Sequence, residues 1–275
     1  MAKQKQNNES TPLRAKDEGS LTPEPAECGR LSEGLQALAS QLEQYLTFEQ
    51  QDALANRSEW QKALQSSVPA QGIGFDKVID ELAKYVIPNG SQIPNPGFTS
   101  FITTGASTMG TLTSLACSVA SPQRVGLTAF TFLEELSLQW LASMFELPAQ
   151  MRGVYSSGGS VANLVSLGVA RQSTFEALGI DPAEEGFTQR CRIYASDSSH
   201  RSIHRAAAIL GMGRNSVVSI RTDSMGRMSP DALRKQLTLD SIPDSKQDLA
   251  QVAIIANAGS TSTGVIDPLL EIGEI

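Results

Sequence analysis

Short β-rich runs alternate with long helical patterns from residue 96 onward, and this alternation limits the possible folds most strongly. The runs with strand character are 152–156, 191–195, 216–220 and 252–257. The helical patterns around them cover about 105–120, 128–146, 160–178, 199–210 and 229–239. Strands that are separated by helices of about ten or more residues usually pair in parallel, and the helices cover both faces of the sheet. We therefore expect an α/β fold with a mainly parallel sheet and helices on both faces.

The chain before this region has a different character. Residues 1–30 are polar, contain three prolines and no aromatic residue, and are expected to form a disordered tail. Residues 31–95 are expected to form a helical N-terminal arm. Its one-faced helical patterns lie at 31–46, about 59–65 and 75–86. Such short helices need a second surface, either the large domain or another subunit. The proline- and glycine-rich stretch 88–97 leads into the expected large domain, 96–275.

The composition is that of a globular protein, with 40% hydrophobic and 19% charged residues. The net charge is −7, which argues against nucleic acid because phosphates are bound by clustered Lys and Arg. No apolar stretch approaches the roughly 18 residues of a membrane span, and no secretory signal is recognisable. The three cysteines are few and far apart, which suits a reducing compartment. We expect a cytoplasmic protein that binds neither nucleic acid nor membrane.

A turn at 153–163, with the sequence GVYSSGGSVAN, is the first candidate for chemistry. Glycine lets backbone N–H groups approach an anion, and a helix N-terminus adds unpaired donors and partial positive charge. A phosphate would fit there. The alternative is a tight turn in which Ser160 caps the helix. The motif is neither GxGxxG nor a Walker A loop, so it does not decide between the two.

The chain has two histidines, His200 and His204, four residues apart on one expected helix. That spacing can bind zinc, but no Glu adjoins the first His, and no Cys or third His is close in sequence. One partly buried and one solvent-facing histidine is the structural interpretation. The functional alternative places the flat ring of His200 over an aromatic ligand. We expect no metal site.

A loop within 254–272, with the sequence IIANAGSTSTGVIDPLLEI, follows the last expected strand. Asp267 and Pro268 in this segment favour a helix start with an Asp cap. Ligands of open α/β sheets lie beyond the carboxyl ends of the strands. Because three loops that follow strands end in small polar residues, we expect them to converge on one ligand. The hydroxyl residues in the last loop are Ser260, Thr261, Ser262 and Thr263.

These motifs resemble those of the pyridoxal-phosphate-dependent group II amino-acid decarboxylases, which include aromatic amino-acid and glutamate decarboxylases. The resemblance runs from about Asn95 to Ile275. It implies the large domain of a type I pyridoxal-phosphate enzyme, with pyridoxal 5′-phosphate as cofactor and an amino acid as substrate. It also implies a homodimer formed through the N-terminal arm. The matching segments are NPGFTSFITTGAS, TFLEELSLQWLASMFELP, RGVYSSGGSVANLVSLGVAR, IYASDSSHRSIHRAAAILGM, DSMGRMSPDAL and ANAGSTSTGVIDPL.

The resemblance assigns roles to residues that stand at matching positions. Gly159 and Ser160 match the phosphate-binding turn. His200 matches a catalytic histidine that stacks on the cofactor's pyridine ring and assists the substrate chemistry. Thr261 matches a further cofactor contact.

The substrate pocket and the departures from the family pattern involve other positions. Phe98 and Phe101 match residues that line the pocket. Asn95 stands where a histidine often precedes the proline, Asn257 replaces a small or hydroxyl residue, and Ser260 replaces a threonine. We infer no particular substrate from these departures.

Two family residues have no counterpart here: an Asp that pairs with the pyridine nitrogen and a Lys that forms the Schiff base. None of the eight lysines follows a histidine. We therefore expect the N-terminal part of a longer enzyme, with an incomplete large domain and no activity alone. The expected activity of the complete enzyme is decarboxylation of an L-amino acid to the amine. The alternatives are another reaction of the family, such as aldehyde synthesis, and a non-catalytic cofactor-binding or dimerising remnant.

Overall fold

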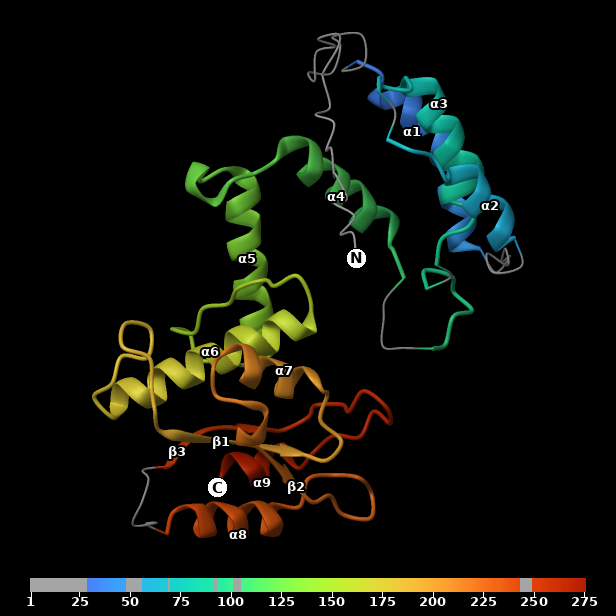
Figure 1. Ribbon diagram of the computed structural model, residues 1–275. Helices are drawn as coiled ribbons and strands as arrows, with labels where there is room; N and C mark the ends of the chain where they lie inside the picture. Colours follow the sequence, from blue (N-terminus) through green and yellow to red (C-terminus); the bar gives the residue numbers. More distant parts are fainter. Residues whose placement is uncertain (1–28, 48–55, 69, 92, 101–104, 243–248) are drawn as a thin grey trace, which may run out of the picture. The chain divides into compact units, whose positions relative to one another are not determined.

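The computed structural model describes residues 29–47, 56–68, 70–91, 93–100, 105–242 and 249–275 (Figure 1). Contacts divide the chain into two compact units, Met1–Ser118 and Val119–Ile275, and each is described by itself. Nearly all of the tail expected at 1–30 lies outside the described residues. The domain boundary expected after residue 95 stays a prediction.

In the first unit, the described residues of the expected arm form several helices. Gly34 lets α1 lie directly against α3, because a Cβ atom there would come within 3.1 Å of the Phe75 ring. Arg30 ties the same helices together through ion pairs of 2.6 Å with Glu33 and with Asp76. The elements are α1 (Leu31–Glu43), η1 (Gln44–Leu46), α2 (Arg57–Leu64), α3 (Phe75–Glu81) and η2 (Leu82–Val86), and α4 (Thr108–Ala120) crosses into the second unit.

The second unit is built on a parallel sheet with the strand order β2-β1-β3. The central strand pairs with β2 from Ile193 to Ser196 and with β3 from Arg190 to Ala195. Their side chains are largely apolar, as in parallel strands that are buried on both faces. The parallel sheet expected from the sequence is confirmed. The strands are β1 (Arg190–Ser196), β2 (Val217–Ile220) and β3 (Leu249–Ile255).

The strand expected at 152–156 is not formed. This segment pairs with no strand among the described residues, and the side chains of Val154 and Tyr155 are 59% and 51% exposed. Residues such as Val and Tyr favour a strand because they pack well on a pleated, half-buried surface. A strand also needs a neighbouring strand to accept and donate its backbone hydrogen bonds. The segment instead runs along α5 (Ala129–Met144), where the Tyr155 hydroxyl lies 3.0 Å from the Ser137 hydroxyl.

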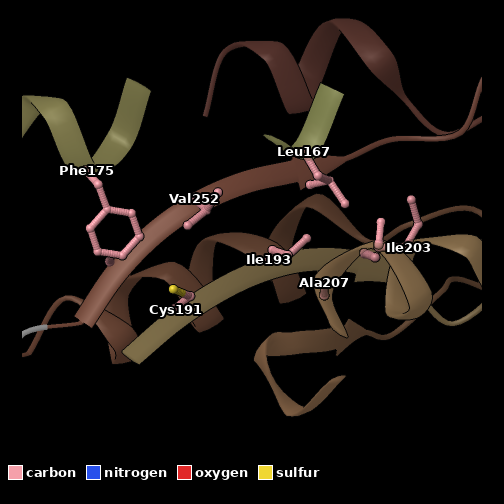
Figure 2. Close-up of a cluster of buried hydrophobic side chains, with 10 residues drawn as sticks. Leu167, Phe175, Cys191, Ile193, Ile203, Ala207 and Val252 are labelled. Carbon is pink, nitrogen blue, oxygen red and sulfur yellow. The ribbon is translucent and has the colours of Figure 1, made fainter. Parts of the chain in front are cut away.

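One face of the sheet is covered by α6 (Gly159–Ala177) and α7 (Ser202–Ile209). Figure 2 shows apolar side chains from both helices gathered with those of β1 and β3. Each of the large apolar side chains in this cluster contributes about 1.5–3 kcal/mol. This core fixes the directions of both helices and therefore the loops at their N-termini. Its labelled members are Leu167, Phe175, Cys191, Ile193, Ile203, Ala207 and Val252.

The other face is covered by α8 (Pro230–Asp240) and α9 (Leu269–Gly273), so helices lie on both faces as expected. Ser229 caps α8 by accepting the Ala232 N–H at 3.2 Å. Tyr194 of β1 is buried on this side and donates its hydroxyl to Asp240 at 3.0 Å. Burial, and then the nearby carboxylate, raise the pKa of Tyr194.

The remaining elements are two short 3-10 helices, η3 (Arg124–Gly126) and η4 (Arg214–Ser216).

Several apolar side chains of α5 are exposed, among them those of Phe132, Trp140 and Met144. None of the helices in the described part of the chain has the length and apolar character needed to cross a membrane.

Candidate functional site

The turn at 156–160 leads into α6 and leaves its N-terminus uncapped. Gly158 is the N-cap residue, and no side chain accepts a hydrogen bond there. Ser160 lies inside the first helical turn, so the interpretation in which Ser160 caps the helix is wrong. A Cβ atom at Gly158 or Gly159 would meet nothing within 4 Å, so the space beside the turn is open. An uncapped helix start beside open space can bind an anion through backbone N–H groups.

The loop after β1 is held in place by hydrogen bonds within the loop and by one to β2. The Ser196 hydroxyl lies 3.0 Å from the Ser198 hydroxyl and 3.3 Å from the Ser199 hydroxyl. The N–H of Ser199 donates to the Ser196 carbonyl at 3.0 Å, and the N–H of Asp197 donates to the Ile220 carbonyl at 3.2 Å. These bonds fix the loop at the carboxyl end of the strand.

His200 lies in this loop and precedes α7. The helix begins at Ser202 rather than at residue 199, so the two histidines do not share it as expected. Nδ1 of His200 accepts the Ser202 N–H at 3.2 Å and lies 2.8 Å from the Ser202 hydroxyl. Because the ring takes up this N–H, residue 200 stays outside the helix. His204 is exposed on α7, and the described residues contain no group of three or more potential metal ligands.

Asn163 joins α6 to the histidine loop. Its Nδ2 donates to the Ser202 hydroxyl at 2.8 Å, and Ser202 is 1% exposed. Asn163 lies about one helical turn after Gly159. A continuous path of two hydrogen bonds therefore connects the first part of α6 with the His200 ring.

Asn257 holds the loop after β3 to the loop after β1. Its Nδ2 donates to the hydroxyls of Ser196 at 2.9 Å and Ser199 at 3.2 Å. Ser260 is buried and forms hydrogen bonds within its own loop. Thr261, the expected cofactor contact, is exposed in the same loop. Its hydroxyl is thus placed where a ligand can reach it.

Asp267 is not a helix cap, contrary to the expectation from the Asp-Pro pair. The N-cap residue of α9 is Pro268, and no side chain caps this helix. Oδ1 of Asp267 accepts the Met228 N–H at 2.7 Å, and Oδ2 accepts the backbone N–H of Asn257 at 2.7 Å and its Nδ2 at 3.1 Å. Three donors to one buried carboxylate stabilise this arrangement more than a single exposed cap would. Asp267 therefore orients Asn257.

These contacts join the three segments that were expected to converge. Asn163 and Ser202 link α6 to the histidine loop, and Asn257 links that loop to the one after β3. Sequence reasoning missed the roles of Asn163 and Ser202, because they depend on α6 lying beside α7. The position of Ser202 two residues after His200 was the one local signal.

The expected pocket residues belong to the first unit or lie outside the described residues. Phe98 is half-buried, and its N–H donates to the Asn95 carbonyl at 3.0 Å. Asn95 is buried, donates to the Thr47 carbonyl and accepts the Gly97 N–H at 2.8 Å. Phe101 is outside the described residues. Their place in a substrate pocket stays a prediction.

The residues of the second unit fit pyridoxal phosphate in chemical type. The uncapped start of α6 suits its phosphate, and the exposed imidazole of His200, joined to the same helix, suits a flat aromatic ring. In the described part of this unit the lysine is Lys235, which is exposed on α8 and thus on the face of the sheet opposite α6 and α7.

Comparison with known proteins agrees with this fit. The chain is 29% identical over 215 residues to Aromatic-L-amino-acid decarboxylase of Bacillus atrophaeus, which covers 77% of this chain and 42% of that protein. It is 25% identical over 225 residues to 4-hydroxyphenylacetaldehyde synthase of Rhodiola rosea, with coverage of 77% of this chain and 44% of that protein. The fold matches the crystal structure of Oryza sativa TDC with PLP and tryptamine, with a TM-score of 0.75, 23% identity, and coverage of 93% of this chain and 56% of that one.

The chain thus spans less than half the length of these two curated relatives. A family model for the pyridoxal-dependent decarboxylase conserved domain matches residues 58–275. Since this match covers most of the chain, the protein belongs to the pyridoxal-dependent decarboxylase family, whose cofactor is pyridoxal 5′-phosphate.

Proposed function

We propose that this chain supplies the phosphate- and ring-binding part of an enzyme that decarboxylates an L-amino acid to the amine. The observation that carries the proposal is the connection between the uncapped start of α6 and His200 through Asn163 and Ser202. It brings an uncapped helix end and an aromatic side chain into one structural unit. The relatives named above, a decarboxylase among them, support the reaction class.

Each residue has a defined task in this proposal. The backbone N–H groups of Gly159 and Ser160 bind the cofactor phosphate, helped by the partial positive charge at the start of α6. The imidazole of His200 stacks on the pyridine ring, and the hydroxyl of Thr261 offers a further hydrogen bond. When bound, the cofactor supplies the electron sink for cleavage of a bond at the amino-acid α-carbon.

We propose further that the chain alone does not turn over substrate. In the second unit, the described lysine, Lys235, lies on the wrong face of the sheet to bond with a cofactor held at Gly159. Phe98 and Phe101 are proposed to line the substrate pocket. A cytoplasmic homodimer is proposed for the complete enzyme, and the unpaired thiols of Cys117 and Cys191 are compatible with a reducing compartment.

Aldehyde synthesis is the second candidate, because one relative is a 4-hydroxyphenylacetaldehyde synthase. The two reactions differ in their products. A decarboxylase releases carbon dioxide and an amine, whereas an aldehyde synthase consumes oxygen and water and releases carbon dioxide, an aldehyde, ammonia and hydrogen peroxide. Product analysis of the complete enzyme with a panel of L-amino acids distinguishes them.

Binding of pyridoxamine 5′-phosphate to the chain tests the phosphate site directly. This compound has no aldehyde, so it cannot react with surface lysines, and pyridoxamine without phosphate is its matched comparison. We expect Gly159→Val to fill the open space beside the turn and to weaken binding at least about tenfold, which corresponds to about 1.4 kcal/mol. Ala177→Val places the same side chain at the exposed end of α6 and is expected to leave the affinity unchanged.

Titration calorimetry with phosphorus NMR gives both the affinity and the environment of the phosphate. If the wild type and Gly159→Val bind pyridoxamine 5′-phosphate with equal affinity, the turn is not the phosphate site. Equal binding of pyridoxamine with and without its phosphate would remove the anion site altogether.

A further inference from the structure

Ser202 stands out among the residues of the site because it is almost fully buried and yet contacts the exposed histidine. Its hydroxyl lies 2.8 Å from Nδ1 of His200 and also accepts Nδ2 of Asn163 at 2.8 Å. Its backbone N–H donates to the same Nδ1 at 3.2 Å. One histidine nitrogen thus faces two groups of a single residue.

These contacts decide which ring nitrogen carries the proton. A backbone N–H can only donate, so Nδ1 must accept and cannot carry a hydrogen in the neutral ring. The Ser202 hydroxyl already accepts from Asn163, so its own hydrogen is free to point at Nδ1. If the Asn163 amide were turned around, its oxygen would accept the hydrogen of the Ser202 hydroxyl. Nδ1 of His200 would then have to carry a proton to bond with that hydroxyl, and this proton would face the backbone N–H of Ser202. The observed set is mutually consistent only with the proton on Nε2.

We propose that Ser202, supported by Asn163, is a positioning residue that holds His200 as the Nε2–H tautomer. Nδ1 is bound to the start of α7, so Nε2 is the nitrogen available to a ligand. It presents a hydrogen-bond donor, which suits a carboxylate, phenolate or carbonyl oxygen. The assignment of that oxygen to cofactor or substrate rests on the proposed function, whereas the tautomer does not.

Nitrogen NMR of the chain labelled with [¹⁵N]histidine tests the proposal. The chain has two histidines, so a His204→Gln variant assigns both rings. In alkaline buffer, where the imidazole is neutral, long-range ¹H–¹⁵N spectra distinguish protonated from unprotonated ring nitrogens. We expect Nε2–H to dominate at His200 in the wild type, without any ligand and without any activity measurement.

Ser202→Ala removes the hydroxyl and keeps the backbone donor. Loss of one hydrogen bond is expected to lower the ratio of Nε2–H to Nδ1–H about 2- to 12-fold. Asn163→Ala, which does not touch the histidine, should lower the ratio in the same direction because the Ser202 hydroxyl is no longer oriented. Ser173→Ala makes the same chemical change as Ser202→Ala on the exposed side of α6 and should have no effect.

Amide spectra establish whether each variant is folded. If Ser202→Ala does not fold, the tautomer ratio of Asn163→Ala tests the proposal instead. A wild type with the proton on Nδ1 overturns the proposal. So does a ratio that changes less than twofold in the folded variants. Because pyridoxamine phosphate binding is measured separately, failure of the tautomer prediction and failure of the phosphate site are distinguishable.

Discussion

Replacing Asp267 with Asn tests how the loops of the site are held together. The substitution keeps the size of the side chain but turns one acceptor oxygen into an NH₂ donor. In the native structure Oδ1 accepts the Met228 N–H, and Oδ2 accepts both donors of Asn257. An amide has one oxygen, so at least one of these donors must face the NH₂ group. Asp267 is 2% exposed, which leaves water little access to compensate.

The least costly orientation keeps the amide oxygen toward Asn257 and leaves the Met228 N–H facing NH₂. A hydrogen bond to a charged group contributes about 1.5–3 kcal/mol, and a buried unsatisfied donor costs about 1–3 kcal/mol. Because these two effects overlap, we expect Asp267→Asn to lower the free energy of unfolding by about 2–4 kcal/mol. The control is Asp231→Asn, whose carboxylate is 97% exposed at the start of α8. It should cost less than about 1 kcal/mol.

Urea unfolding followed by far-ultraviolet circular dichroism measures both variants. With a slope of about 2 kcal/mol per molar urea, the midpoint of Asp267→Asn should fall by about 1–2 M, and that of Asp231→Asn should fall by less than about 0.5 M. Equal midpoints for the two variants would show that the three hydrogen bonds of Asp267 do not hold the loops, and the argument from its burial would be wrong.

Three further predictions concern the site and the core. In the complete enzyme, His200→Ala should lower turnover about 10²–10⁴-fold, whereas His204→Ala should have little effect; steady-state kinetics of both variants check this, and equal small effects would contradict the role of the His200 ring. Burial raises the pKa of the Cys191 thiol to about 11, so at pH about 8 it should hold roughly 200-fold less thiolate than an ordinary cysteine; peptide mapping after iodoacetamide treatment should find the half-buried Cys117 modified well before Cys191, and equal labelling would contradict the burial. Phe175→Ala should cost about 3–5 kcal/mol of stability, measured by urea unfolding; a loss below about 1 kcal/mol would mean that the core of Figure 2 repacks freely.

The strands and helices of the second unit were predictable where their local pattern agrees with their surroundings. The run 191–195 became β1 because Ile193 and Tyr194 are buried on opposite faces of the sheet. The helical pattern expected at about 229–239 became α8, which Ser229 caps and in which Pro230 is the first residue. The run 152–156 failed because strand formation depends on a neighbour, and nothing in the run itself encodes one.

The candidate site was predictable in its residue types but not in its hydrogen-bond partners. The Asp267-Pro268 pair reads as a helix cap whether or not the cap forms, since the sequence does not show the competing donors. One of them, the Met228 N–H, lies 39 residues away. The expected position of His200 on a helix failed for a related reason: the ring competes with the helix for the Ser202 N–H.

Asn257, which was expected to depart from the family pattern, has a structural role in the described part of the chain. Its side-chain nitrogen has two hydrogens, and three oxygens lie within reach: the hydroxyls of Ser196 and Ser199 and the carboxylate of Asp267. With more acceptors than hydrogens, the amide has no donor left for a ligand. A small side chain at this position would make none of these bonds, and a single hydroxyl has one hydrogen to share among the three oxygens. The asparagine therefore connects the buried carboxylate of Asp267 to the loop before His200.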